Sequence, residues 1–140
     1  ARLENTVRAA GSTASVVFAG KVPHGEVPKE LGQLDIYVAL SREESFGVAV
    51  LEASSCALPV VVSDAGGLPE VVENGVTGMV VPRGNVDAAV AALRQLVLDR
   101  DLRSRMGKAG RELVQRTYAW PRCVDRMVEV LQEAVNTQRR

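Results

Sequence analysis

The stretch SREESFGVAVLEASSCALPVVVSDAGGLPEVV, residues 41–72, decides the fold class of this chain. It joins a turn at Phe46 and Gly47 to a short helical pattern, GVAVLEASSCA, which leads into the apolar run PVVVS at residues 59–63. Short β-branched runs bounded by turn residues are typical of buried strands. A helix leading directly into such a strand favours a crossover within a parallel sheet.

The same alternation of strand and helix continues on both sides of this stretch. Strands are predicted at four places, residues 15–20, 35–40, 59–63 and 78–82. Segments of helical length or spacing, such as EVPKELGQL and GLPEVVENG, lie between them. Strands separated by helices predict an α/β domain with a parallel sheet and flanking helices.

The C-terminal third changes character, because from Asn85 onward the chain has helical spacing and no further strand pattern. Asn85 is predicted to cap the first helix there. Gly107 and Gly110 are expected to interrupt the second. In the third helix Pro121 suits the first turn, and an apolar face is expected to pack in the core. That face consists of Trp120, Val124, Met127, Val128, Leu131 and Val135. We expect one domain over residues 1–140.

Composition excludes several classes of protein. The 17 basic and 17 acidic residues give a net charge of zero, so a dedicated nucleic-acid binder is not expected. The longest apolar runs are far shorter than the roughly 20 residues that cross a bilayer, and no secretory signal pattern is present. These features favour a soluble, cytoplasmic chain. Cys56 and Cys123 are too few and too far apart to predict a disulfide framework or a zinc site.

Glu44 and Glu52 flank the apolar stretch at residues 45–51, where the helical pattern GVAVLEASSCA begins. In an open α/β sheet the loop holding Glu44 follows the carboxyl end of a strand, where ligands bind. A helix beginning at Gly47 would offer free N–H groups and its dipole to an anion such as a phosphate. A carboxylate at Glu52 suits the vicinal hydroxyls of a ribose. The alternative is that the two glutamates only complement the helix dipole or face solvent.

The residues themselves carry a resemblance to a known family. The run EESFGVAVLEASSCALPVVVSDAGGLPEVVENGVTGMVVP resembles the signature of glycosyltransferase family 4, retaining enzymes of the GT-B fold, in their C-terminal donor-binding domain. The likeness covers residues 20–120 in order, from VFAGKVP to RTYAW. It implies a Rossmann-like sheet, a nucleoside-diphosphate sugar as donor, a carbohydrate, lipid or small-molecule acceptor, and no separate cofactor.

The resemblance also implies roles for particular residues. Glu44 would contact the hydroxyls of the donor sugar and stabilise the oxocarbenium-like transition state. Backbone amides would hold the sugar and the diphosphate, and they belong to Phe46, Gly47 and Val48. Glu52 would bind the ribose. The loop that begins with Gly20 would receive the nucleobase, mainly through backbone groups around Val22. No metal is expected, because no carboxylate pair has the spacing of an Asp-x-Asp clamp.

Two residues depart from the family pattern. Ala57 occupies a helix-to-strand turn that usually holds glycine, so this turn either avoids a positive φ or is strained. Ala119 stands where a serine or threonine often precedes the tryptophan, which removes a possible N-cap worth about 1 kcal/mol. We therefore expect the last helix to fray at its start.

The larger departure is that the resemblance begins at what would be the third strand of the donor domain. Two central strands, a basic pair that clamps the diphosphate, and an N-terminal acceptor domain are not in these residues. We therefore expect a sheet edge that needs further chain, or a second chain, to complete it, and no activity from these residues alone. The resemblance implies a cytoplasmic enzyme, with peripheral binding to the inner membrane face left open. The alternative function is a non-catalytic nucleotide- or sugar-binding module or a split subunit.

Overall fold

The computed structural model describes residues 2–138 and has an α/β fold. Its sheet consists of three parallel strands in the order β1-β2-β3, which confirms the predicted fold class. The strands are β1 (Tyr37–Ala39), β2 (Val60–Ser63) and β3 (Gly78–Val81). Three of the four predicted strands are therefore present, each slightly shorter than the sequence pattern indicated.

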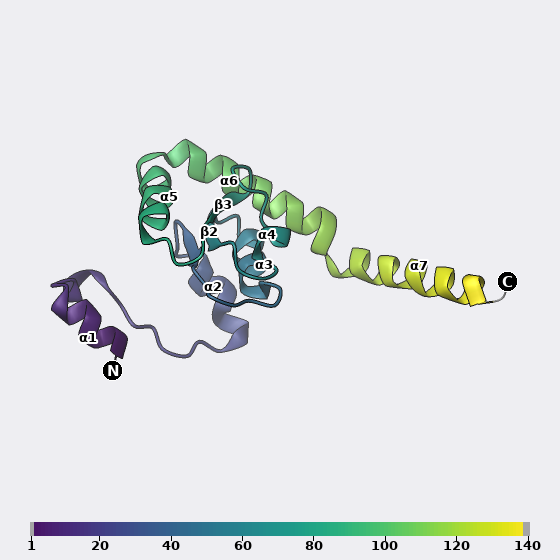
Figure 1. Ribbon diagram of the computed structural model, residues 1–140, viewed down its shortest axis with the longest axis horizontal. Coiled ribbons are helices and arrows are strands. Elements are labelled where there is room, and N and C mark those ends of the chain that lie inside the picture. The colour runs from purple at the N-terminus through teal and green to yellow at the C-terminus, as the bar shows by residue number, and fades with distance from the viewer. Residues whose placement is uncertain (1, 139–140) are drawn as a thin grey trace.

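Helices and helical turns make up most of the remaining chain. They are α1 (Arg2–Ala9), η1 (Thr13–Ser15), η2 (His24–Glu26), α2 (Val27–Leu31), α3 (Val48–Ser55), α4 (Leu68–Val71), α5 (Val86–Leu98), α6 (Arg100–Leu113), η3 (Val114–Tyr118) and α7 (Trp120–Gln138). Figure 1 shows α3 and α4 beside the sheet, α5 and α6 wrapping its other side, and α7 projecting away from this body.

The central strand β2 joins two apolar clusters, because successive side chains of a strand point to opposite faces. Val60 and Val62 pack with residues of α3 and α4, whereas Val61 packs with residues of α5 and α6. All four residues of β2 are buried. This run of buried valines places the core on both faces of the sheet and explains why PVVVS is apolar without alternation.

The two glycines of α6 serve helix packing and do not interrupt the helix, contrary to the sequence prediction. A Cβ on Gly107 would overlap the backbone carbonyl of Ala57, and one on Gly110 would stand 3.4 Å from the Cβ of Ser54. Glycine thus lets α6 approach the C-terminal end of α3 closely. The cost of glycine in a helix is offset by this contact.

The strand predicted at residues 15–20 is wrong. Val16 has extended backbone angles, but no strand in the described part of the chain lies beside this segment to form a ladder. Val17 and Phe18 are 90% and 50% exposed. Extended β-branched sequence becomes a strand only where backbone groups of a neighbour accept its hydrogen bonds, so local propensity was insufficient here.

The expectation that α7 packs in the core is also wrong. Trp120 is 78% exposed and Leu131 is 59% exposed, and the other apolar residues of that face are exposed as well. Pro121 does lie in the first turn, as predicted. Over residues 2–138, no helix combines the length and the apolar character needed to span a bilayer.

One capping prediction is confirmed, and the expected fraying at the start of α7 stays a prediction. The side chain of Asn85 accepts a hydrogen bond from the N–H of Ala88 at 2.9 Å, which confirms it as the N-cap of α5. Ala57 has φ +61°. The turn between α3 and β2 therefore does not avoid a positive φ, and its alanine is strained. Ala119 precedes α7 with extended angles, and its carbonyl accepts from Cys123 N–H as an N-cap carbonyl does.

Candidate functional site

The loop of residues 41–47 leaves the carboxyl end of β1 and leads into α3. Three of its backbone carbonyls accept hydrogen bonds from three other parts of the chain. Ser63 Oγ donates to the carbonyl of Ser41 at 2.6 Å, Arg83 Nη1 to that of Arg42 at 3.0 Å, and Gly67 N–H to that of Glu44 at 3.2 Å. Carbonyl groups are thereby fixed by the ends of β2, β3 and the turn before α4, which holds the loop in one conformation.

Glu44 is half-buried and its carboxylate turns back onto its own loop. Oε1 accepts hydrogen bonds from the N–H groups of Ser45 at 3.0 Å and Phe46 at 3.4 Å. The second contact is long, so the Phe46 N–H is only weakly engaged. The predicted catalytic carboxylate and one of the predicted binding amides therefore share a single small site.

Gly47 lies directly before α3 with φ +97°, a conformation that side chains rarely adopt. A Cβ at this position would stand 2.8 Å from Cδ2 of Leu68. The need for glycine thus comes from the backbone conformation and from packing against α4, while the close ligand approach stays a prediction. Val48 begins α3, where N–H groups have no intrahelical acceptor and point toward the loop side.

Glu52 lies on α3 and lines a pocket of about 150 Å³. The other lining residues come from η2, α2 and the C-terminal end of α3, and they are His24, Val27, Pro28, Leu31, Ser55 and Cys56. The pocket walls are mostly apolar, and Glu52 contributes a carboxylate to them.

The nucleobase loop predicted around Gly20 and Val22 lies just ahead of η2. Val22 is half-buried, and His24, two residues further on, lines the Glu52 pocket. Gly20 is exposed with φ +73°, and no atom lies within 4 Å of the place where its Cβ would be. The structure therefore brings the η2 end of this loop beside Glu52 and leaves Gly20 farther out on the surface.

Tyr37 is a site residue that sequence reasoning missed. Burial raises the pKa of its phenol above the ordinary 10.0, and the carboxylates of Glu52 and Glu44 raise it further. The charges of both glutamates thus act on the same tyrosine of β1. The alternation of β1 gives a signal for this, since Tyr37 and Ala39 share the face that packs toward α3.

Residues 2–138 contain no cluster of three or more His, Cys, Asp or Glu side chains arranged to hold a metal ion. Asp64, Glu70 and Glu73 line a separate pocket of about 490 Å³ beside α4 and β3. The expectation of a metal-independent site remains a prediction.

The architecture places this chain in a class. A parallel sheet between helical layers, with the Glu44 loop at the strand ends, is the architecture of the Rossmann-like C-terminal domains of GT-B proteins. Residues 1–113 match the family described as "Glycosyl transferases group 1", and the chain belongs to this family.

Individual relatives agree with this assignment. The chain is 33% identical over 128 residues to a GDP-mannose-dependent alpha-(1-6)-phosphatidylinositol monomannoside mannosyltransferase of Mycobacterium tuberculosis, covering 86% of this chain and 33% of that protein. Sucrose-phosphate synthase from Thermosynechococcus elongatus has a TM-score of 0.89 at 28% identity, covering 97% of this chain and 34% of that one.

A third similarity shows the fold alone. Anabaena Alr3699/HepE, solved in complex with UDP, has a TM-score of 0.88 at 22% identity, covering 94% of this chain and 36% of that one. The present chain spans about a third of the length of each of these three proteins.

Proposed function

We propose that this chain is the donor-binding part of a retaining family 4 glycosyltransferase, which transfers a sugar from a nucleoside-diphosphate sugar to an acceptor. The observation that carries the proposal is the Glu44 loop, in which a fixed carboxylate and the amides that open α3 meet at the carboxyl end of β1. Membership of the group 1 family supports it.

The geometry of Glu44 suits contact with a donor sugar. Its Oε1 accepts a hydrogen bond from the Ser45 N–H and a longer one from the Phe46 N–H, which keeps the carboxylate on its own loop. Oε2 then accepts a sugar hydroxyl, and the negative charge stabilises the positive ring of the transition state. Because the carboxylate is already oriented, little reorganisation accompanies the reaction.

The leaving diphosphate is received at the start of α3. The N–H groups of Phe46, Gly47 and Val48 and the helix dipole meet its developing charge, together with basic groups from outside these residues. Glu52 accepts the ribose hydroxyls. The acceptor then attacks the sugar from the face that the diphosphate leaves, so the configuration is retained. If chelator abolished activity of the complete protein and manganese restored it, the metal-free part of this proposal would be wrong.

The relatives' names guide the choice of nucleotide for the first experiment. One is GDP-mannose-dependent and another was solved with UDP. We would therefore titrate the complete protein that carries residues 1–140 with UDP, GDP and ADP by calorimetry. We expect one of them to bind, and Glu52→Ala to weaken that binding by about 1–3 kcal/mol through loss of a charge-assisted hydrogen bond.

A matched control keeps this experiment specific. Glu112→Ala removes an exposed carboxylate of α6 that does not line the Glu52 pocket, so it should leave nucleotide binding unchanged. Absence of binding for all three nucleotides in a folded protein would favour the non-catalytic module instead.

We also propose that further strands complete the sheet next to β1. Two observations support this: β1 forms one edge of the sheet, and the exposed apolar residues Val16, Val17 and Phe18 belong to no strand. An edge strand with free backbone groups and exposed valines is a site for strand addition. A monomeric 140-residue chain that melts cooperatively on its own would contradict this proposal.

A further inference from the structure

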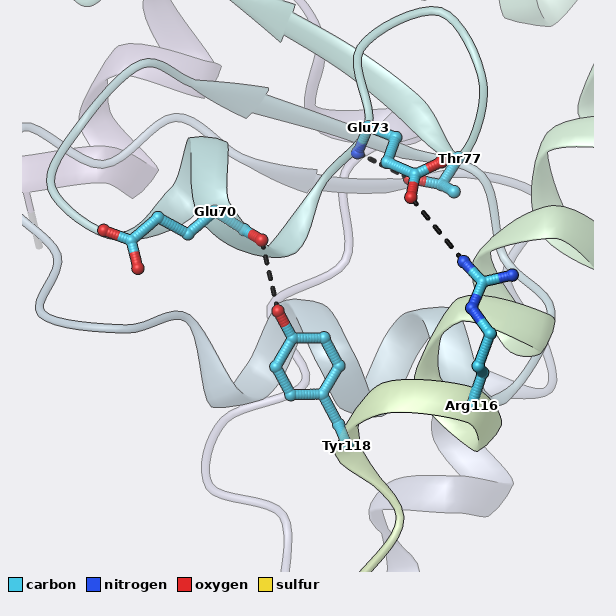
Figure 2. Close-up of polar contacts among 5 residues, drawn as sticks. All are labelled: Glu70, Glu73, Thr77, Arg116 and Tyr118. Carbon is cyan, nitrogen blue, oxygen red and sulfur yellow. Dashed lines mark hydrogen bonds and ion pairs between the residues drawn. The ribbon is translucent and has the colours of Figure 1, made fainter. Parts of the chain in front are cut away.

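The π-helix η3 connects α6 to α7 and carries Tyr118 at its end. Helices of this kind are rare and are frequently found at functional sites. Here the wider turn directs Tyr118 and Arg116 toward α4 and the segment that follows it (Figure 2). Residues distant in sequence are thereby brought to the rim of the Glu44 loop.

Tyr118 makes two contacts with this region. Its hydroxyl donates to the backbone carbonyl of Glu70 at 3.1 Å, while the Glu70 carboxylate points away (Figure 2). Its ring stands edge to face against Phe46, with centroids 6.0 Å apart and planes at 70°. Such aromatic pairs contribute beyond the area that they bury. Tyr118 therefore ties Phe46 to the end of α4.

Tyr118 stays a hydrogen-bond donor at neutral pH. Burial raises the pKa of its phenol above 10.0, and the charges of Glu70 and Cys123 raise it further. The Phe46 N–H donates only a long hydrogen bond, to Glu44 Oε1 at 3.4 Å. A bond of this length does little to fix the direction of the N–H group. The ring contact with Tyr118 restrains the Phe46 side chain, and Gly67 packs against the Phe46 backbone.

Arg116 shows what a purely structural contact on the same π-helix looks like. Its guanidinium lies 3.8 Å from the carboxylate of Glu73, and both side chains are more than half exposed. The Glu73 N–H in turn donates to Thr77 Oγ1 at 3.0 Å (Figure 2). An exposed pair of this kind contributes little to stability and does not reach the Glu44 loop.

We propose that Tyr118 is a positioning residue for the Phe46 amide, and that it thereby sets the affinity of the site for the second phosphate of a nucleoside diphosphate. The choice of ligand rests on the proposed function. The positioning role rests on the contacts of Tyr118 with Phe46 and Glu70. It predicts a selective effect: the nucleoside and first phosphate do not depend on Tyr118, whereas the diphosphate does.

Two measurements on the complete protein test this inference. The first is hydrogen exchange of the backbone amides in residues 41–51, without ligand. The second is the binding of UMP against UDP and of GMP against GDP, since the members of each pair differ only in the second phosphate. The variants are Tyr118→Leu, which removes ring and hydroxyl, and Tyr118→Phe, which keeps the ring. Arg116→Gln on the same π-helix is the control.

In Tyr118→Leu we expect loop exchange to be roughly tenfold faster, and affinity for the diphosphate to fall roughly tenfold while that for the monophosphate holds. Tyr118→Phe should change both less, because the ring contact remains, and it keeps the test valid if Tyr118→Leu does not fold. Arg116→Gln should change neither.

The outcomes separate this inference from the proposed function. If mono- and diphosphate affinities fell together, or if loop exchange stayed at the wild-type rate in both Tyr118 variants, the positioning role would be overturned. If the unaltered protein bound no nucleotide, the proposed function would fail, and the exchange measurement alone would then decide whether Tyr118 fixes the loop.

Discussion

The backbone of Gly66 lies directly on the carbonyl oxygen of Glu44, so closely that a Cβ at Gly66 would overlap that oxygen. The next N–H, that of Gly67, donates to the same carbonyl at 3.2 Å. The paired glycines of the turn before α4 thus form the surface on which the Glu44 loop rests. Their role is structural, and it acts on the residue that the family resemblance assigns to catalysis.

Gly66→Ala should therefore destabilise the protein and displace the Glu44 loop. Gly66 has φ +52°, so alanine adds backbone strain to the steric overlap, and we expect a loss of about 2–4 kcal/mol in the free energy of unfolding. Urea unfolding of the complete protein measures this.

Gly75→Ala is the matched control for that variant. Gly75 also has a positive φ, +80°, but nothing lies within 4 Å of its Cβ position. We expect only the strain, about 1–2 kcal/mol. Equal losses in the two variants would mean that contact with the Glu44 carbonyl contributes nothing.

Ala57→Gly should stabilise the protein. Ala57 holds φ +61° in the turn between α3 and β2, where alanine is strained and glycine is not. Relief of strain exceeds the added flexibility of the unfolded chain, so we expect a gain of about 0.5–1 kcal/mol in the free energy of unfolding. Ala49→Gly, at an exposed position of α3, should instead cost about 1 kcal/mol. A loss of stability in Ala57→Gly would contradict the assignment of strain.

Ala119→Ser should strengthen the start of α7. Ala119 has the extended angles of an N-cap residue, and a serine hydroxyl there would accept from the N–H of Arg122, since Pro121 has none. We expect a gain of about 0.5–1 kcal/mol, observed as slower hydrogen exchange in the first turn of α7. Ala119→Val, which cannot accept, should give no such protection.

Stability should decline in alkaline solution partly through Tyr37. Its pKa is raised in the folded chain, so folding favours the neutral phenol. This contribution is fully present below pH 10.0, the ordinary pKa, and is lost as the pH rises through the raised value. Unfolding measured across this range should show a smaller decline in Tyr37→Phe.

The same pKa offers a test of the geometry between Tyr37 and Glu52. Glu52→Gln removes one of the charges that raise it, so the phenolate absorbance should appear at lower pH than in the unaltered protein. An unchanged titration would mean that the two side chains lie farther apart than the structure has them.

Much of the fold and part of the site followed from local sequence. The apolar runs at β1, β2 and β3, the Asn85 cap and the turn at Gly47 depend on nearby residues, and the structure confirms them. Glu44 and Glu52 were named because spacing from a strand end and a helix start is also a local property. Their roles remain proposals.

Tertiary structure decided the rest. Residues 15–20 have strand propensity but no neighbour, and the apolar face of α7 has helical spacing but no described surface to cover it. Gly107 and Gly110 weaken a helix locally, yet their lack of a side chain lets α6 pack closely against the C-terminal end of α3. The ring contact of Tyr118 with Phe46 and its hydrogen bond to the carbonyl of Glu70 join residues far apart in the chain. The sequence by itself determined the three strands of the sheet and where the acidic loop lies, because these depend on local spacing. Only the packed chain decided which partners hold that loop in place.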